Sequence, residues 1–130
     1  MRRRIKAVIL DLSGTTCDHY ALAPTYAVKN VFANFGVNIS TSLASGPMGL
    51  RKDVHFNRLL EDERVQKAWH HVHSCTPRAD IEGKMLFKNF EKEQLKCIET
   101  YSAAIPKTAE AFDELRALDI KIGATTGFSR

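Results

Sequence analysis

The segment Ile5-Lys6-Ala7-Val8-Ile9-Leu10 is the feature that most constrains the fold of this chain. It is short, rich in β-branched residues and mostly apolar, which is typical of a buried strand. Asp11 closes the segment, and the turn-forming residues Ser13-Gly14-Thr15-Thr16 follow. In an open α/β sheet, ligands bind at the carboxyl ends of the strands, because loops and helix N-termini converge there. We therefore expect an α/β fold with Asp11 at a ligand-binding edge.

A second strand of the same kind is predicted near the other end of the sequence, at residues 120–125, and it runs into Thr126 and Gly127. An amphipathic helix is predicted just before it, at residues 108–118. The spacing of apolar residues between the two strands is helical, and it predicts helices at residues 24–35, 40–45, 52–60, 61–70 and 80–101, the first opened by Pro24 and the last capped by Asp80. The order is strand, helical insertion, helix, strand.

The composition favours a soluble globular protein with one modest core: 130 residues, 44% hydrophobic and 26% charged. No apolar run approaches the roughly 20 residues of a membrane span. Cys17, Cys75 and Cys97 are odd in number and lack CxxC spacing, which favours neither disulfides nor zinc and predicts a cytoplasmic location. The net charge of +4 favours an anionic ligand, but the basic residues are dispersed, so nucleic-acid binding is not expected.

Asp11 has two readings on its own. A carboxylate that follows a buried strand is poised to react, while the backbone N–H groups of Gly14 and Thr15 cradle a phosphoryl group. An aspartate that merely caps the turn is the structural alternative. The stretch Asp11-Leu12-Ser13-Gly14-Thr15-Thr16 resembles the first motif of the haloacid dehalogenase superfamily, and this resemblance implies that Asp11 attacks phosphorus. Ser13 replaces the second aspartate that phosphatases of the superfamily use as a general acid.

Lys52 lies in the stretch Met48-Gly49-Leu50-Arg51-Lys52-Asp53-Val54-His55. A lysine on a helix is usually a solvated charge, so its type alone says little. The stretch resembles the Met-Gly-Leu-x-Lys signature of the phosphonoacetaldehyde hydrolase family. The resemblance implies that Lys52 forms a Schiff base with the substrate aldehyde, that His55 assists proton transfer and that Met48 contacts the substrate. A carbon leaving group needs such an electron sink.

The same resemblance extends to the second strand, where Thr126 and the N–H of Gly127 correspond to the superfamily's second phosphoryl-binding motif. It implies Mg²⁺ held by the Asp11 carboxylate and the backbone carbonyl of Ser13. The implied fold is a Rossmann-like haloacid dehalogenase core, incomplete here with two parallel strands at residues 1–20 and 103–130, and a helical cap at 21–102. The chain then corresponds to the N-terminal part of the family, and we expect its activity to be impaired by this truncation. Cap helices of this kind imply a homodimer.

Three further readings remain open. A capped phosphatase or phosphomutase acting on a phosphate ester would use the same first motif, although Ser13 argues against it. A catalytically inactive truncated homologue would act as a dimerisation partner. His70, His71, His73 and Cys75 suggest a metal site, but helical spacing spreads adjacent side chains around the axis and favours an ordinary helix surface.

Overall fold

The structure, a computed structural model, describes residues 4–127. It divides into two compact units. Of the described residues, the strand unit contains 4–22 and 101–126, and the helical unit contains 23–100 and Gly127.

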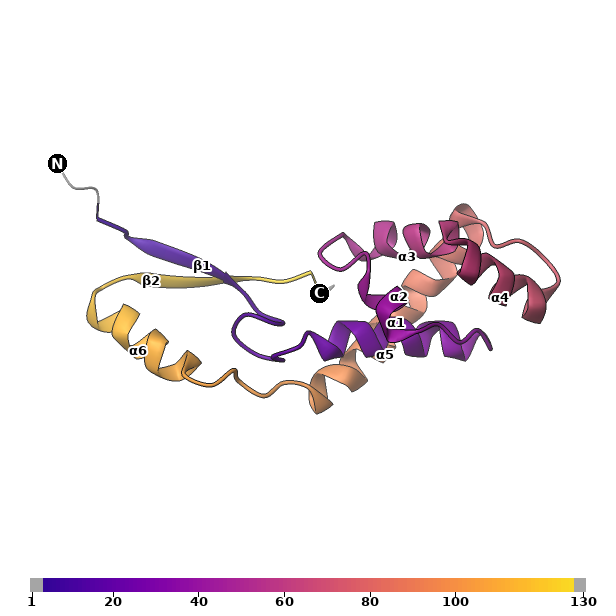
Figure 1. The fold of residues 1–130 in the computed structure, drawn as a ribbon. Helices are drawn as coiled ribbons and strands as arrows, with labels where there is room; N and C mark the ends of the chain where they lie inside the picture. Colours follow the sequence, from indigo (N-terminus) through magenta and orange to yellow (C-terminus); the bar gives the residue numbers. More distant parts are fainter. Residues whose placement is uncertain (1–3, 128–130) are drawn as a thin grey trace. The chain divides into compact units, whose positions relative to one another are not determined.

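The strand unit is built on a parallel pair of strands, β1 (Ala7–Asp11) and β2 (Lys121–Thr125), with α6 (Thr108–Ala117) leading into β2 (Figure 1). The register pairs Asp11 with Thr125, so both strands end at the same edge. The sequence prediction of two parallel strands joined through helices is confirmed. Parallel pairing requires a long crossover, and here the helical unit and α6 supply it.

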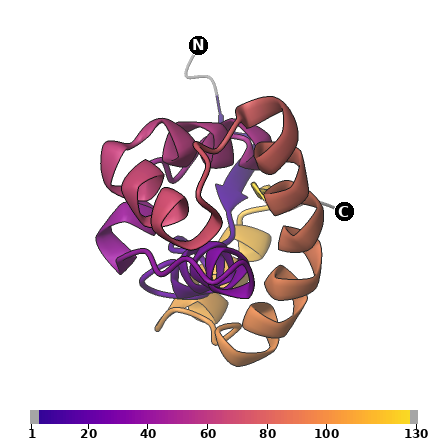
Figure 2. The same ribbon diagram turned by 90° about the vertical axis from the view of Figure 1, so that its right-hand side faces the viewer.

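The elements between the strands are α1 (Leu22–Asn34), α2 (Thr41–Ser45), α3 (Lys52–Glu61), α4 (Glu63–His73), the π-helical turn η1 (Ala79–Gly83) and α5 (Lys84–Thr100). Aromatic side chains join these helices. Phe32 of α1 contacts the rings of Phe56 on α3 and Trp69 on α4, and Phe56 meets Phe90 of α5 edge-on at 5.7 Å between ring centroids. Helix α1 is seen nearly end-on in Figure 2. No helix among residues 4–127 has the length and apolar content needed to cross a membrane.

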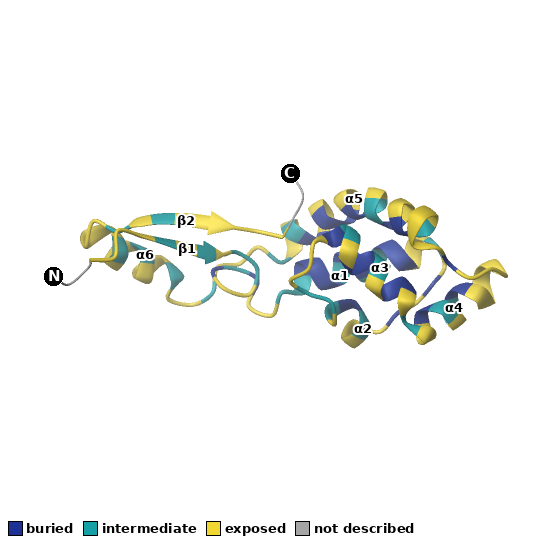
Figure 3. Cartoon of the chain, turned by 90° about the horizontal axis from the view of Figure 1, so that it is seen from above, coloured by how far each residue is buried: buried dark blue, intermediate teal, exposed yellow. Residues whose placement is uncertain are grey.

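Burial differs sharply between the units (Figure 3). Every hydrophobic residue that is buried among the described residues lies between Ala23 and Cys97, in the helical unit. In β1, Val8 and Leu10 are half-buried, whereas Ile9 on the opposite face is 71% exposed. Strands of parallel sheets are normally covered on both faces. The face of this strand pair that carries Ile9 is therefore exposed.

Two helix starts differ from the sequence prediction. Helix α1 begins at Leu22, two residues before Pro24, and the Leu22 N–H donates to the carboxylate of Asp18 at 2.8 Å. Pro24 is compatible with the first turn because an N–H is not needed there. The prediction that Asp80 caps the long helix was wrong: Asp80 lies inside η1 and pairs with Arg78, and α5 begins only at Lys84.

Candidate active site

One carbonyl, that of Leu12, accepts several hydrogen bonds within the loop after β1. The carbonyl oxygen of Leu12 accepts the backbone N–H groups of Thr15, Thr16 and Cys17 at 2.9–3.2 Å, and the Thr16 hydroxyl at 3.2 Å. Thr16 is buried, whereas Asp11 is exposed. This compact turn fixes the backbone directly after Asp11 and leaves the carboxylate open to solvent in the strand unit.

Gly14 and Thr15 belong to this turn, but their N–H groups already have acceptors within it. The Gly14 N–H donates to the carbonyl of Cys17 at 2.8 Å, and the Thr15 N–H to Leu12 at 3.2 Å. Gly14 has a φ of +84°, a conformation that favours glycine. A phosphoryl group bound here would share these donors with the loop or use the exposed Thr15 side chain. Their role in substrate binding stays a prediction.

Asp18 is a functional candidate that the sequence analysis missed. Its side chain accepts the Ser13 hydroxyl at 2.8 Å on one oxygen and the Leu22 N–H at 2.8 Å on the other. Its own N–H donates to the carbonyl of Ala103 at 2.9 Å. Asp18 is 6% exposed and has a φ of +51°, which aspartate tolerates better than most residues. It therefore ties the loop after Asp11 to the start of α1 and to the returning chain.

The end of β2 lies beside this loop in the strand register. Because Asp11 pairs with Thr125, the next residue, Thr126, follows the same edge of the strand pair. Gly127 is exposed and comes directly after it. Ser13 is half-buried, with its hydroxyl donated to Asp18. The strand unit thus holds Asp11, Ser13 and Thr126 at the carboxyl end of its two strands.

The turn between α2 and α3 places Lys52 at the first position of α3. Gly49 has a φ of +93°, which turns the chain sharply before the helix. The neighbours of Lys52 in the sequence, Arg51 and Asp53, form an exposed ion pair with each other. Lys52 itself is only 6% exposed. The first turn of α3 therefore directs two charges to solvent and one into the helical unit.

The environment of the Lys52 amine is apolar. Its Nζ donates to the Met48 sulfur at 3.7 Å and lies 5.8 Å from the centroid of the Phe90 ring. Burial lowers the pKa of Lys52 below its ordinary value. Its position at the N-terminus of a helix, where the helix dipole disfavours a cation, acts in the same direction. The neutral amine, which is the nucleophilic form, is therefore more populated in Lys52 than in a surface lysine.

His55 lies one turn further along α3 and is fully buried. Its Nε2 is 2.9 Å from the carbonyl oxygen of Ala44, and its Nδ1 has no hydrogen-bond partner. Burial, together with the charge of Lys52, lowers the pKa of His55 to about 4, while the contact with Ala44 opposes the shift. His55 is therefore neutral near pH 7. Sequence periodicity identified Phe90 as a core residue but gave no signal of its contact with Lys52.

The histidines of α4 do not gather into a metal site in the described part of the chain. The Nε2 of His73 is 2.8 Å from the carbonyl of Phe35, and its ring lies 4.6 Å from that of Trp69. Within residues 4–127 there is no group of three or more His, Cys, Asp or Glu side chains placed to hold a metal ion.

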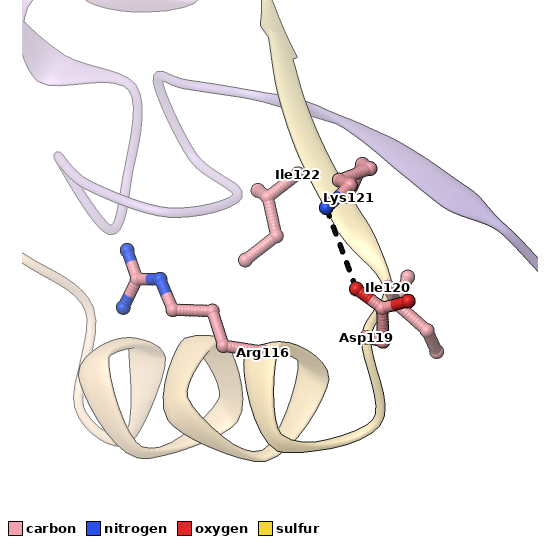
Figure 4. Close-up of a pocket in the computed structure, with 5 residues that line it drawn as sticks. All are labelled: Arg116, Asp119, Ile120, Lys121 and Ile122. Atoms are coloured by element: carbon pink, nitrogen blue, oxygen red, sulfur yellow. Dashed lines mark hydrogen bonds and ion pairs between the residues drawn. The ribbon is translucent and has the colours of Figure 1, made fainter.

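Two hollows lie apart from these candidate residues. One, of about 410 Å³, is lined by Arg116 of α6, by Asp119 and Ile120 of the loop that follows, and by Lys121 and Ile122 of β2 (Figure 4). Within it, the Lys121 amine donates to the Asp119 carboxylate at 3.4 Å. It lies toward the start of β2, away from the strand end that carries Thr126. The other, of about 380 Å³, is lined by residues of α3, η1 and α5, including Asp53, Asn57 and Phe87. Neither hollow is lined by Asp11 or Lys52.

Each unit thus collects one set of the predicted site residues. The strand unit holds Asp11, Ser13 and Thr126, and the helical unit holds Met48, Lys52 and His55. Within the helical unit these side chains interact: the Lys52 amine contacts the Met48 sulfur, and its charge lowers the pKa of His55.

Sequence comparison relates the chain to one family of enzymes. No family profile matches the chain. It is 38% identical over 129 residues to the phosphonoacetaldehyde hydrolase of Paraburkholderia phytofirmans, a match that covers 98% of this chain and 48% of the relative. The phosphonoacetaldehyde hydrolase of Bacillus cytotoxicus is 36% identical with the same coverage of both chains. The chain therefore spans about half the length of these curated relatives.

Structure comparison gives the same relationship. A phosphonoacetaldehyde hydrolase-like protein from Oleispira antarctica superposes with a TM-score of 0.90 and 34% identity, covering 96% of this chain and 45% of that one. A predicted phosphoglycolate phosphatase from Haemophilus somnus superposes with a TM-score of 0.72 at 16% identity, covering 97% and 53% of the two chains, and supports the haloacid dehalogenase-like fold alone. By sequence and by fold, the chain is similar to the phosphonoacetaldehyde hydrolases, with a haloacid dehalogenase-like fold, and it spans about half of their length.

Proposed function

We propose that this chain carries the nucleophile and the imine-forming lysine of a phosphonoacetaldehyde hydrolase, which converts phosphonoacetaldehyde and water to acetaldehyde and phosphate. The observation that carries the proposal is the burial of Lys52 beside Met48 and Phe90, which favours its neutral form. The relatives named above are hydrolases with this substrate in their names, and the chain matches about half of each.

The first step joins the Lys52 amine to the aldehyde carbon and expels water. It requires an uncharged amine, and burial of Lys52 supplies it by lowering the pKa. The step also takes up one proton from solvent, so the product is a protonated imine. This iminium group can accept the electron pair of the carbon–phosphorus bond, which otherwise has no electronegative atom to receive it.

The second step transfers the phosphoryl group to the Asp11 carboxylate. The phosphorus–carbon bond breaks, its electrons pass into the iminium group, and the carbon fragment remains on Lys52 as an enamine. Water then hydrolyses the aspartyl phosphate to phosphate. The enamine takes up a proton, and water releases acetaldehyde and the free lysine. Asp11 is exposed at the end of β1, as this role requires.

Ser13 distinguishes this proposal from a phosphate-ester hydrolase. A phosphatase must protonate an alkoxide leaving group, and related phosphatases use an aspartate two residues after the nucleophile. Here the residue is Ser13, whose hydroxyl proton is directed to Asp18 at 2.8 Å. A serine hydroxyl is a poor acid, and this one already donates its proton. This favours a reaction whose leaving carbon is stabilised by Lys52 instead.

The oxygen donors in the strand unit are of the type that Mg²⁺ prefers, which is an argument for the predicted magnesium site. The Asp11 carboxylate and the Ser13 backbone carbonyl are both hard ligands, and Mg²⁺ commonly keeps several waters beside one or two carboxylates. When bound, such an ion neutralises charge on the phosphoryl oxygens. These two residues would hold it.

The test is release of acetaldehyde and phosphate from phosphonoacetaldehyde in the presence of magnesium. We expect equal release of both products, abolished by Asp11→Ala and by Lys52→Arg. Asp113→Ala, an exposed aspartate on α6, is the matched control and should leave release unchanged. Release that survives either active-site substitution would contradict the assigned roles.

A further inference from the structure

The aromatic ring of Phe90 lies under the Lys52 amine, although the two residues belong to different helices. Lys52 is the first residue of α3, Phe90 is in α5, and the Lys52 Nζ lies over the ring, 5.8 Å from its centroid. We infer that Phe90 is a positioning residue for Lys52, and that the face of its ring holds the Lys52 cation where an ordinary buried lysine has a carboxylate. The inference deepens the proposed function, since it rests on Lys52 as the imine-forming residue.

The distance between the amine and the ring is that of a cation–π contact. The face of an aromatic ring is negative, and it attracts a cation that lies within about 6 Å of the ring centroid. The attraction is stronger where water is excluded. Both partners are buried, with Lys52 at 6% and Phe90 at 0% exposure. The Met48 sulfur, 3.7 Å from Nζ, is a second polarisable neighbour. The amine is therefore held by uncharged groups.

No carboxylate takes this place in the part of the chain that the structure describes. Buried lysines are almost always paired with an anion, yet the ion pairs within residues 4–127 do not include Lys52. Acidic side chains on α3 and on the elements packed against it pair with other cations: Asp53 with Arg51, Glu63 with Lys67, Asp80 with Arg78 and Glu93 with Lys96. A carboxylate beside Lys52 would strongly favour its charged form. A ring attracts the cation more weakly, so the amine can still lose its proton.

The Phe90 ring is fixed by its own packing. It meets the ring of Phe56 edge-on, with 5.7 Å between the centroids and an angle of 71° between the planes. Phe56 is fully buried and lies one turn after Lys52 on α3. Residues one turn apart share a face of a helix. The face of α3 that carries the amine therefore also carries the ring that Phe90 packs on.

An aromatic ring suits a nitrogen that must change its charge during the reaction. In the proposed function the Lys52 nitrogen is positive as an ammonium ion, neutral when it attacks the aldehyde, and positive again as a protonated imine. The ring face attracts both cations. Because the ring is not a base, it does not compete for the proton that the amine gives up. Phe90 acts in this way through Lys52.

This role differs in sign from a role in packing alone. If the Phe90 ring attracts the cation, weakening that attraction makes Lys52 easier to deprotonate. If the ring only excludes water, disturbing it lets water reach the amine. Burial is the cause of the lowered pKa of Lys52, so relieving the burial would make Lys52 harder to deprotonate.

The experiment titrates the Lys52 side chain by NMR in the full chain with isotope-labelled lysine, from neutral to alkaline pH. The Lys52 signal is the one that Lys52→Arg removes. His55, whose pKa is about 4, stays neutral over this range and does not interfere. Pentafluorophenylalanine in place of Phe90 keeps the aromatic shape but reverses the charge of the ring face. We expect the proton affinity of Lys52 to fall roughly threefold to tenfold.

A single para-fluorine on Phe90 disturbs packing least and should give a smaller fall in the same direction. It decides the question if circular dichroism shows that the pentafluoro variant has lost its helices. Pentafluorophenylalanine in place of Phe32 is the matched control. The Phe32 ring is equally buried but packs on Phe56 and Trp69, so the titration of Lys52 should not change.

A proton affinity of Lys52 that is unchanged or higher in the fluorinated Phe90 variants would overturn the inference. Cleavage of phosphonoacetaldehyde by the unsubstituted chain is measured separately, and cleavage together with such a titration would leave the proposed function standing. A graded fall in proton affinity in a chain that does not cleave phosphonoacetaldehyde would support the role of Phe90 in holding the cation and contradict the proposed function.

Discussion

Lys52 and His55 are buried basic residues, and burial favours the uncharged form of each. The consequences for stability differ from those for a surface pair. A histidine whose pKa is lowered in the folded state must be protonated when the chain unfolds in mild acid, so acid favours unfolding. His55 is therefore both a candidate functional group and a pH-dependent term in folding.

We expect the free energy of unfolding to fall as the pH drops from about 6.5 toward 4, because His55 takes up a proton near pH 6.5 when unfolded and near pH 4 when folded. The full effect is roughly 3 kcal/mol. In His55→Gln this part of the pH dependence should disappear. Urea unfolding at pH 7, 6, 5 and 4 measures it. His71→Gln, an exposed histidine of α4, is the control, and an equal flattening in that variant would contradict the assignment.

Glu93 also makes the free energy of unfolding fall as the pH drops, but it does so at lower pH than His55. It is 6% exposed, accepts from Lys96 at 2.8 Å and Asn34 at 3.1 Å, and its pKa is lowered chiefly by the hydrogen bond from Lys96. Its stabilisation is complete above its unfolded pKa of about 4.5 and is lost as the pH falls through the lower folded value. Glu93→Gln should therefore cost about 1 kcal/mol at pH 7 and progressively less below pH 4.5.

Urea unfolding of Glu93→Gln and Glu91→Gln at pH 7 and at pH 3 measures how the cost of each substitution depends on pH. Glu91 is exposed on the same helix and should show no such difference. A cost for Glu93→Gln that stays constant from pH 7 to pH 3 would rule out the ion pair with Lys96 as its cause.

At the scale of elements, the loop from β1 to α1 is organised by Asp18. Asp18→Ala removes the acceptor for the Ser13 hydroxyl and for the Leu22 N–H, and leaving such donors unpaired costs roughly 1–3 kcal/mol. We expect the Leu22 amide to exchange with deuterium at least tenfold faster in this variant, a change of about 1.4 kcal/mol in local opening. Hydrogen exchange read by NMR gives the answer residue by residue.

The matched substitution for this experiment is Asp113→Ala on α6, whose carboxylate is exposed and paired with Arg116. The exchange rate of Leu22 should not change in it. Equal protection of Leu22 in the Asp18→Ala variant and the unsubstituted chain would show that Asp18 does not hold the start of α1.

The sequence predicted those elements whose apolar pattern is local. Both strands and the helix around Lys52 lie close to the expected positions, because short β-branched runs and the 3.6-residue period are visible in the sequence. The start of α5 was missed because η1 is stabilised by the Glu82 carboxylate on the Arg78 N–H, a contact that periodicity does not encode. The role of Asp18 was missed because it depends on bringing Ala103 beside residue 18.

The candidate site was predicted through motif resemblance rather than through physical pattern. The types and spacing of Met48, Lys52 and His55 identified them together. Nothing in the sequence indicated that the Phe90 ring lies near the Lys52 amine or that Ala44 determines the tautomer of His55. Both contacts join residues from different helices and arise only from tertiary packing.

At the scale of the whole molecule, the two units differ in how much apolar surface they bury. Buried hydrophobic residues among the described ones belong to the helical unit, while Ile5 and Ile9 of the strand unit are 67% and 71% exposed. Hydrophobic burial is the main source of folding stability. We expect amides of β1 and β2 to exchange with deuterium at least roughly tenfold faster than those of α1 and α5. Uniform protection across both units would contradict this account.

The family resemblance also predicts a homodimer through the helical unit. The long helix α5 exposes Leu95 at 64% and Met85 at 43%, and such side chains are candidates for a contact with a second copy. Light scattering after size exclusion should give twice the mass of one chain, and Leu95→Lys should shift the protein to the monomer. A monomer at all concentrations in the original sequence would contradict the expectation.

The central claim is that Lys52 condenses with an aldehyde substrate, and borohydride trapping with phosphonoacetaldehyde tests it most directly. Reduction of the imine makes a stable adduct whose position a peptide mass spectrum identifies. We expect one adduct per chain on Lys52, absent in Lys52→Arg and retained in Asp11→Ala, because condensation precedes phosphoryl transfer. Labelling spread over exposed lysines such as Lys88, with none on Lys52, would contradict it.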